Sequence, residues 1–245
     1  MVVKEYGKVN KDIIILLHGG GLSCWNYEEE KEMLKNKYHV ILPILDGHSK
    51  SDKNFTSIED NANEIIEYID NNCNGRVKLI GGLSLGAQVL LEILGKRENI
   101  CEYAIIESAL IYPMKVTNKL ITPSINMSYK LIHKKWFSKL QFKSLKLKES
   151  LFDKYYKDSS NITKNNMISF LKANTNYCMK NIKNNKTKAI VIVGSKERKI
   201  MIKSAKKINS ELKNSNLEIL EGYYHGELSI NHPDEYVAII KKLIK

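Results

Sequence analysis

The 245-residue sequence predicts an α/β fold in which a doubly wound, mostly parallel sheet is covered by helices on both faces. Three observations support this prediction. Short apolar segments rich in β-branched residues recur along the chain, helical patterns fill most of the intervals, and the spacing suits right-handed crossovers. The predicted strands are residues 13–17, 40–44, 77–80, 103–106, 189–193 and 217–220.

The helical patterns between these strands are amphipathic. Residues 57–72 carry an apolar face at helical spacing, and Ser57 is suited to cap the first turn. Further helices are expected over residues 85–96, over residues 199–213 and after Pro233.

One interval breaks the alternation of strands and helices. Between residues 106 and 189 there is no clean strand but several amphipathic stretches, and a structureless loop of that length is improbable. We therefore expect a helical cap at residues 111–188, inserted into a core domain of residues 1–110 and 189–245. Within it a run of large apolar residues has helical spacing, for which packing on the core is favoured over contact with a ligand or membrane. The run is Ile132, Trp136, Phe137 and Leu140.

The net charge of +12 is unevenly distributed. Residues 111–188 contain 17 lysines and 3 acidic residues, so the rest of the chain is close to neutral. Such a segment could attract anionic substrates or a membrane surface, but lysine-rich composition on solvated helices is the favoured interpretation. Neither membrane association nor nucleic-acid binding is expected, and no nucleic-acid-binding module accompanies the lysines.

The sequence shows neither a membrane span nor a secretory signal. No stretch approaches the roughly 20 apolar residues of a membrane span, and the first ten residues lack the apolar centre of a secretory signal. A cytoplasmic location is therefore the expectation.

The four cysteines form no C-x-x-C pair, so free and mostly buried thiols are favoured over a zinc site or a disulfide framework, although Cys24 could line a pocket. No metal or organic cofactor is expected.

The pattern with most chemical content is Gly-Leu-Ser-Leu-Gly at residues 82–86. A predicted strand precedes it and a predicted helix follows it. A sharp strand-to-helix turn of this kind strains the backbone of Ser84, is tolerated only with small neighbours, and raises the hydroxyl above the sheet. Ser84 is therefore the candidate nucleophile.

A serine nucleophile needs a base, an acid that orients the base, and donors for the oxyanion. His225 is the favoured base because it follows the last predicted strand, at the same carboxyl edge of the sheet as Ser84. Glu197, which follows the strand at residues 189–193, is the favoured acid. Glu107, at the tip of the strand before the insertion, stays open as the alternative acid.

The oxyanion donors are expected to be backbone amides. Residues 18–21 read His-Gly-Gly-Gly directly after the first predicted strand, and glycines allow a close approach to the substrate. The amides of Gly20 and Leu85 are favoured, with Gly21 as second choice. A phosphate site is disfavoured because neither G-x-x-x-x-G-K-[ST] nor G-x-G-x-x-G occurs.

The chain order Ser84, Glu197, His225, together with the HGGG and GxSxG patterns, resembles the α/β-hydrolase superfamily over nearly the whole chain outside the insertion. Residues 46–51 also resemble a structural turn of that family, with Ser49 where glycine is usual, so His48 is given no catalytic role. The family's acid is more often aspartate than glutamate. The resemblance implies an α/β-hydrolase fold and a serine hydrolase that cleaves a small ester or related acyl substrate through an acyl-enzyme. Carbon–carbon bond hydrolysis, thioester cleavage, acyl transfer and non-catalytic ligand binding remain as alternatives.

Overall fold

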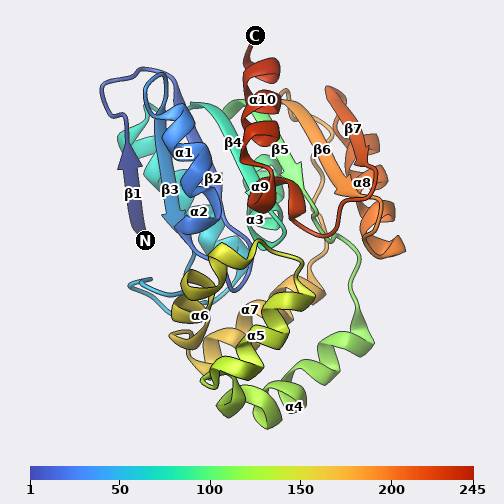
Figure 1. The fold of residues 1–245 in the computed structure, drawn as a ribbon. Helices are drawn as coiled ribbons and strands as arrows, with labels where there is room; N and C mark the ends of the chain where they lie inside the picture. The colour runs from blue at the N-terminus through green and yellow to red at the C-terminus, as the bar shows by residue number, and fades with distance from the viewer.

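The computed structural model describes all residues, 1–245, and is built on one seven-stranded sheet (Figure 1). The strand order is β1-β3-β2-β4-β5-β6-β7, and every neighbouring pair except β1 and β3 is parallel. The strands are β1 Val2–Tyr6, β2 Ile13–Leu17, β3 His39–Ile44, β4 Val77–Leu83, β5 Cys101–Glu107, β6 Lys188–Gly194 and β7 Ser215–Leu220. The predicted fold class is confirmed, and each predicted strand lies within an observed one.

Strand β1 was not predicted. It pairs antiparallel with β3 at the edge of the sheet, and all five of its residues are only partly buried. Lys4 and Glu5 fit such an edge, where charged side chains reach water and discourage pairing with another chain. The same two residues interrupt the apolar pattern by which the other strands were recognised.

Helices cover both faces of the sheet. Helices α2, α3 and α8 pack on one face, with Ile65, Leu90 and Ile208 in a shared apolar cluster, whereas α1, α9 and α10 pack on the other around Tyr236. The Ser57 hydroxyl accepts a hydrogen bond from the Asp60 amide at 2.9 Å, which confirms the predicted cap of α2. The bounds are η1 Cys24–Tyr27, α1 Glu28–Leu34, α2 Ile58–Asn72, α3 Leu85–Lys96, α8 Lys199–Glu211, α9 Glu227–Asn231 and α10 Pro233–Ile244.

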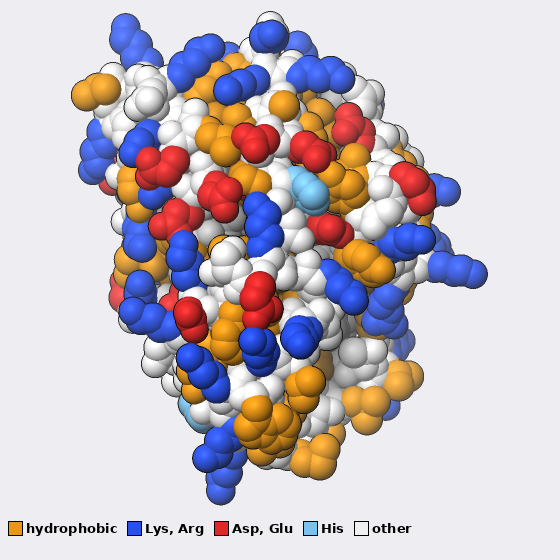
Figure 2. Space-filling model, viewed as in Figure 1, with side chains coloured by type: hydrophobic (Ala, Val, Ile, Leu, Met, Phe, Trp, Pro, Cys, Tyr) orange, Lys and Arg blue, Asp and Glu red, His pale blue; other side chains and the backbone are white.

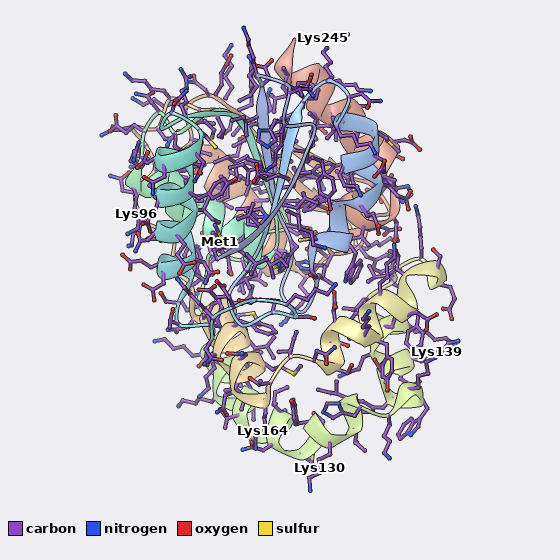
Figure 3. The ribbon with its side chains drawn as sticks, turned by 90° about the vertical axis from the view of Figure 1, so that its left-hand side faces the viewer. Met1, Lys96, Lys130, Lys139, Lys164 and Lys245 are labelled. Atoms are coloured by element: carbon purple, nitrogen blue, oxygen red, sulfur yellow. The ribbon has the colours of Figure 1, made fainter.

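The long interval between β5 and β6 contains no strand. Its elements are α4 Lys115–Ile132, α5 Lys135–Ser144, η2 Glu149–Leu151, α6 Phe152–Ser160 and α7 Lys164–Asn176. They gather beyond the end of the sheet to which the parallel strands point (Figure 1). In the view turned by 90°, Lys130, Lys139 and Lys164 lie on these helices, at the end of the molecule opposite Lys245 (Figure 3). Residues 111–188 are called the helical segment below.

The predicted packing of the run from Ile132 to Leu140 is wrong in part. Helix α4 ends at Ile132 and α5 begins at Lys135, so the run does not lie along one helix. Ile132 is buried, but Trp136 is 60% exposed and Leu140 is 59% exposed. The turn between the two helices places these two side chains on the outside. None of the helices combines the length and the apolar character that a membrane span requires.

Candidate active site

Ser84 occupies the tight turn between β4 and α3. Its φ angle of 52° lies in the left-handed region that residues other than glycine rarely adopt. Glycine is required at both flanking positions, because a side chain there would collide with the backbone. A Cβ at Gly86 would lie 2.2 Å from the Leu17 carbonyl oxygen, and one at Gly82 would lie 2.5 Å from the Gly86 carbonyl oxygen. The backbone is thus held in a strained form by its packing, which fits the predicted elbow.

Substitution of Gly86 by alanine should lower the free energy of unfolding by about 3 kcal/mol, because the added methyl group would have to displace buried backbone. Gly95 lies in the same helix, but a Cβ there would meet only ordinary contacts, the nearest at 3.5 Å. Gly95→Ala should therefore stabilise the protein, by up to about 1 kcal/mol. Urea unfolding followed by circular dichroism measures the free energy of unfolding of both variants. An equal loss of stability in the two would contradict the predicted clash at Gly86.

The His225 ring connects Ser84 to Glu197. Its Nε2 atom lies 3.0 Å from Ser84 Oγ, and its Nδ1 atom lies 2.6 Å from Glu197 Oε2. The loops after β6 and β7 meet closely, since the Lys196 amide donates to the Tyr223 carbonyl oxygen at 3.0 Å and a Cβ at Gly194 would lie 2.1 Å from that oxygen. This contact brings the histidine and the glutamate, 28 positions apart in the chain, to one place.

Glu197 is the buried partner of the ring, with a side chain that is 1% exposed. Its Oε1 atom accepts hydrogen bonds from the Ser108 hydroxyl at 2.6 Å and from the Gly194 amide at 2.9 Å. Burial opposes ionisation, but these bonds and the contact with His225 lower the pKa of Glu197. Ser108 was not predicted at the site; the available signal was its position next to Glu107, at the end of the predicted strand 103–106.

Partial desolvation by the surrounding protein lowers the pKa of the His225 ring, but its hydrogen bond with Glu197 and the charge of that carboxylate more than offset this, so that the pKa is raised overall. The side chain is 48% exposed and is therefore accessible to a ligand.

Glu107 does not contact the ring. One of its carboxylate oxygens accepts from the Ser229 amide at 3.3 Å, and the other has no hydrogen-bond partner. Burial, together with the nearby charge of Glu197, raises the pKa of Glu107 to about 7. The geometry therefore favours Glu197 over Glu107 as the acid that pairs with His225.

The amides of Gly20 and Leu85 lie beside Ser84. The Gly20 amide donates no hydrogen bond within the protein, and Leu85 is the first residue of α3, so its amide lies outside the helical ladder. A Cβ at Gly20 would lie 3.6 Å from that of Leu85, and Gly20, Ser84 and His225 line one small cavity of about 70 Å³. Gly21 does not line this cavity, and its φ of 76° serves the turn instead.

His18 positions the glycine loop. Its Nε2 atom accepts from the Leu45 amide at 3.1 Å, and its Nδ1 atom donates to the Gly19 carbonyl oxygen at 2.9 Å. Burial, with the neighbouring His48, lowers the pKa of His18 to about 3, so the ring stays neutral and keeps this tautomer. His48 is itself buried and stacks on Phe170, which agrees with the absence of a catalytic role for it.

A larger cavity of about 340 Å³ opens above Ser84 and His225. Its remaining walls come from α8, from the loops that follow β5, β6 and β7, and from the helical segment, and many of them are apolar. They are Leu110, Met114, Thr117, Ser144, Leu145, Asn174, Thr175, Lys196, Glu197, Arg198, Ile200, Met201 and Tyr224. Cys24 lines a separate cavity of about 210 Å³ away from Ser84, and burial raises the pKa of its thiol to about 11.

The strand order and the strained serine between β4 and α3 define an α/β hydrolase, and the chain is an enzyme of this class. It belongs to the family described as serine aminopeptidase, S33, whose model matches residues 8–229. The resemblance seen in the sequence is thereby confirmed. No curated protein matches the sequence.

Solved structures similar to this chain share its fold at low identity. MenH from S. aureus is 18% identical with a TM-score of 0.76, and 99% of this chain and 97% of that chain are covered. An esterase from Exiguobacterium antarcticum is 17% identical with a TM-score of 0.80, over 99% and 94%. The enol-lactonase from Burkholderia xenovorans LB400 is 13% identical with a TM-score of 0.80, over 99% and 95%. At these identities the likeness establishes the fold.

Proposed function

We propose that the chain is a serine hydrolase that cleaves a small ester or a related acyl substrate through a covalent acyl-enzyme. The observation that carries this proposal is the hydrogen-bonded series Ser84–His225–Glu197 at the floor of a cavity, beside two available amides. Ser84 is the nucleophile, His225 the base, and Glu197 the acid that orients the ring. This small-molecule acyl substrate is the only partner proposed for the site.

The steps follow from the distances. His225 Nε2 takes the proton as Ser84 Oγ attacks the carbonyl carbon, and the oxyanion that forms is held by the Gly20 and Leu85 amides. His225 then protonates the leaving alcohol. A water molecule, deprotonated by the same ring, attacks the acyl-enzyme and releases the acid.

The charges of the cavity favour an acyl substrate over a peptide with a free amino terminus. A substrate ammonium group needs a carboxylate partner when it leaves water. The one carboxylate in the cavity lining is Glu197, and both of its oxygens are engaged, with His225 on one side and with Ser108 and Gly194 on the other. The apolar walls from Leu110, Met114 and Leu145 suit an acyl chain.

The helical segment, residues 111–188, acts in this proposal as a cap over a core of residues 1–110 and 189–245. Its contributions to the cavity come from the beginning of α4, the end of α5 and the end of α7, which supply Thr117, Ser144 and Thr175. A cytoplasmic location stays a prediction.

Hydrolysis of p-nitrophenyl esters from acetate to octanoate tests the proposed activity directly. Turnover of the shorter esters is expected, since the cavity of about 340 Å³ accepts a small acyl group. A protein that turned over none of them and did not react with a fluorophosphonate probe would instead support non-catalytic ligand binding.

The proposed base also predicts a pH dependence. Protonated His225 cannot accept the Ser84 proton, so kcat/KM should be low in acid and rise as the ring loses its proton. Because Glu197 raises the pKa of His225 above the ordinary 6.5, the midpoint of this rise should lie above pH 6.5. A profile of kcat/KM against pH measures it, and a midpoint below 6.5 would contradict the coupling of the ring to Glu197.

A further inference from the structure

Exposed large apolar side chains are concentrated in one part of the molecule. Eleven such residues are found in the whole chain, and seven of them lie between residues 116 and 145. They are Val116, Leu120, Met127, Leu131, Trp136, Leu140 and Leu145, called the apolar face below. Apolar side chains gather over the α4 and α5 end of the surface in Figure 2. Scattered exposed apolar residues are ordinary, but a contiguous group marks an interaction site.

The apolar face is ordered along its two helices. In α4 its members, Val116, Leu120, Met127 and Leu131, are separated by four, seven and four residues, which places them along one side of the helix. In α5, Trp136 and Leu140 are four residues apart and repeat the pattern. Met127 is 82% exposed and Val116 is 74% exposed, so the chain leaves much of this side open to solvent.

The same stretch is strongly basic. Residues 108–148 contain nine lysines and no acidic residue. Lys135, Lys139 and Lys148 contact carboxylates outside the stretch, on Asp153, Glu149 and Glu29. The other six have no carboxylate within 4.0 Å; they are Lys115, Lys119, Lys130, Lys134, Lys143 and Lys146. The partner of this surface must therefore offer both negative charge and an apolar interior.

We propose that the apolar face and its lysines dock on an anionic lipid surface. The large apolar side chains would enter the boundary between headgroups and acyl chains while the lysine amines stay among the headgroups. A second copy of this chain fits less well, because a symmetric contact would bring two groups of unpaired lysines together. Nucleic acid would satisfy the lysines but would leave the apolar stripe of α4 in water.

The apolar face continues to the opening of the cavity above Ser84. Leu145 belongs to the face and also lines that cavity, and Thr117, next to Val116, lines it as well. Docking would therefore bring the opening close to the lipid. Lipid docking does not depend on the proposed reaction, but if both hold, an amphiphilic acyl compound could pass from the surface into the site. From the sequence, contact of this run with a membrane is the disfavoured alternative, because the exposure of Trp136 and Leu140 is decided by the turn between α4 and α5.

Co-sedimentation of the full-length protein with vesicles tests the proposal. Binding is expected to equimolar phosphatidylglycerol and phosphatidylcholine, to weaken with added salt, and to be at least about ten-fold weaker with phosphatidylcholine alone. The double variant Trp136→Ser with Leu140→Ser should lose at least about ten-fold in affinity for the anionic vesicles. Lys130→Glu with Lys143→Glu should lose at least as much, since each lysine near the surface contributes about five-fold.

Matched controls lie elsewhere on the surface. Val9→Ser with Ile219→Ser removes exposed apolar residues outside the face, and Lys213→Glu with Lys242→Glu reverses exposed charges away from α4 and α5. Both should bind within about two-fold of the unmodified protein.

Equal binding to neutral and anionic vesicles, no binding at low salt, or equal losses in the controls would overturn the proposal. The proposal would also be overturned by a dimer that forms without lipid and dissociates in the variant Trp136→Ser with Leu140→Ser. Displacement of the protein from vesicles by added DNA would overturn it as well. Turnover of a water-soluble ester reports separately on the proposed reaction, so failure of one proposal is distinguished from failure of the other.

Discussion

Replacement of Ser84 by alanine is expected to lower kcat by about 10⁴-fold to 10⁶-fold on any ester that the protein hydrolyses. The hydroxyl is the only group placed 3.0 Å from His225 Nε2, and without it no covalent intermediate can form. The fold should be unaffected, because the strain at this position is held by Gly82 and Gly86 and not by the serine side chain. Steady-state kinetics and labelling by a fluorophosphonate probe measure the loss.

Ser144 provides a matched control. It lines the same cavity, but its hydroxyl donates to the Gln141 carbonyl oxygen at 2.6 Å and has no histidine beside it. Ser144→Ala should therefore keep probe labelling and most of the turnover. Labelling that persisted in Ser84→Ala would contradict the assignment of the nucleophile.

Replacement of Glu197 by glutamine should cost about 10⁴-fold in kcat. The Ser108 hydroxyl and the Gly194 amide both donate to Oε1, so a glutamine would place its carbonyl oxygen there and turn its NH₂ group toward His225. That group would donate to Nδ1 and move the ring proton to Nε2. The ring could then no longer accept the Ser84 proton, although the shape of the site would hardly change.

Glu107→Gln is the matched control for the acid. Glu107 is equally buried but bonds to the Ser229 amide instead of to the ring. With a pKa of about 7, Glu107 is already about half neutral at neutral pH and does not touch the ring, so a neutral amide should change kcat by less than about ten-fold. A larger loss in Glu107→Gln than in Glu197→Gln would reverse the assignment. Retained near-ultraviolet circular dichroism in both variants would exclude unfolding as the cause.

The core of the fold could be predicted because its strands are buried on both faces. Segments such as Ile13–Leu17 are continuously apolar for that reason, and they stand out from the amphipathic helices between them. Strand β1 was not predicted because an edge strand is partly exposed and need not be continuously apolar. The turn at residues 133 and 134 was not predicted because helical spacing alone cannot locate the end of one helix and the start of the next.

The sequence by itself determined the local chemistry of this protein. The glycines at 82 and 86 permit the tight turn around Ser84, where any larger residue would collide with backbone, and the order of strands and loops brings residues after β6 and β7 to the same edge as the serine. Tertiary structure alone places Glu197 and not Glu107 against His225, because Glu107 ends β5, Glu197 follows the neighbouring β6, and only packing directs one carboxylate to the ring and the other to Ser229. It also decided that Trp136 and Leu140 face outward, since burial depends on how helices pack and not on the spacing of apolar residues within one.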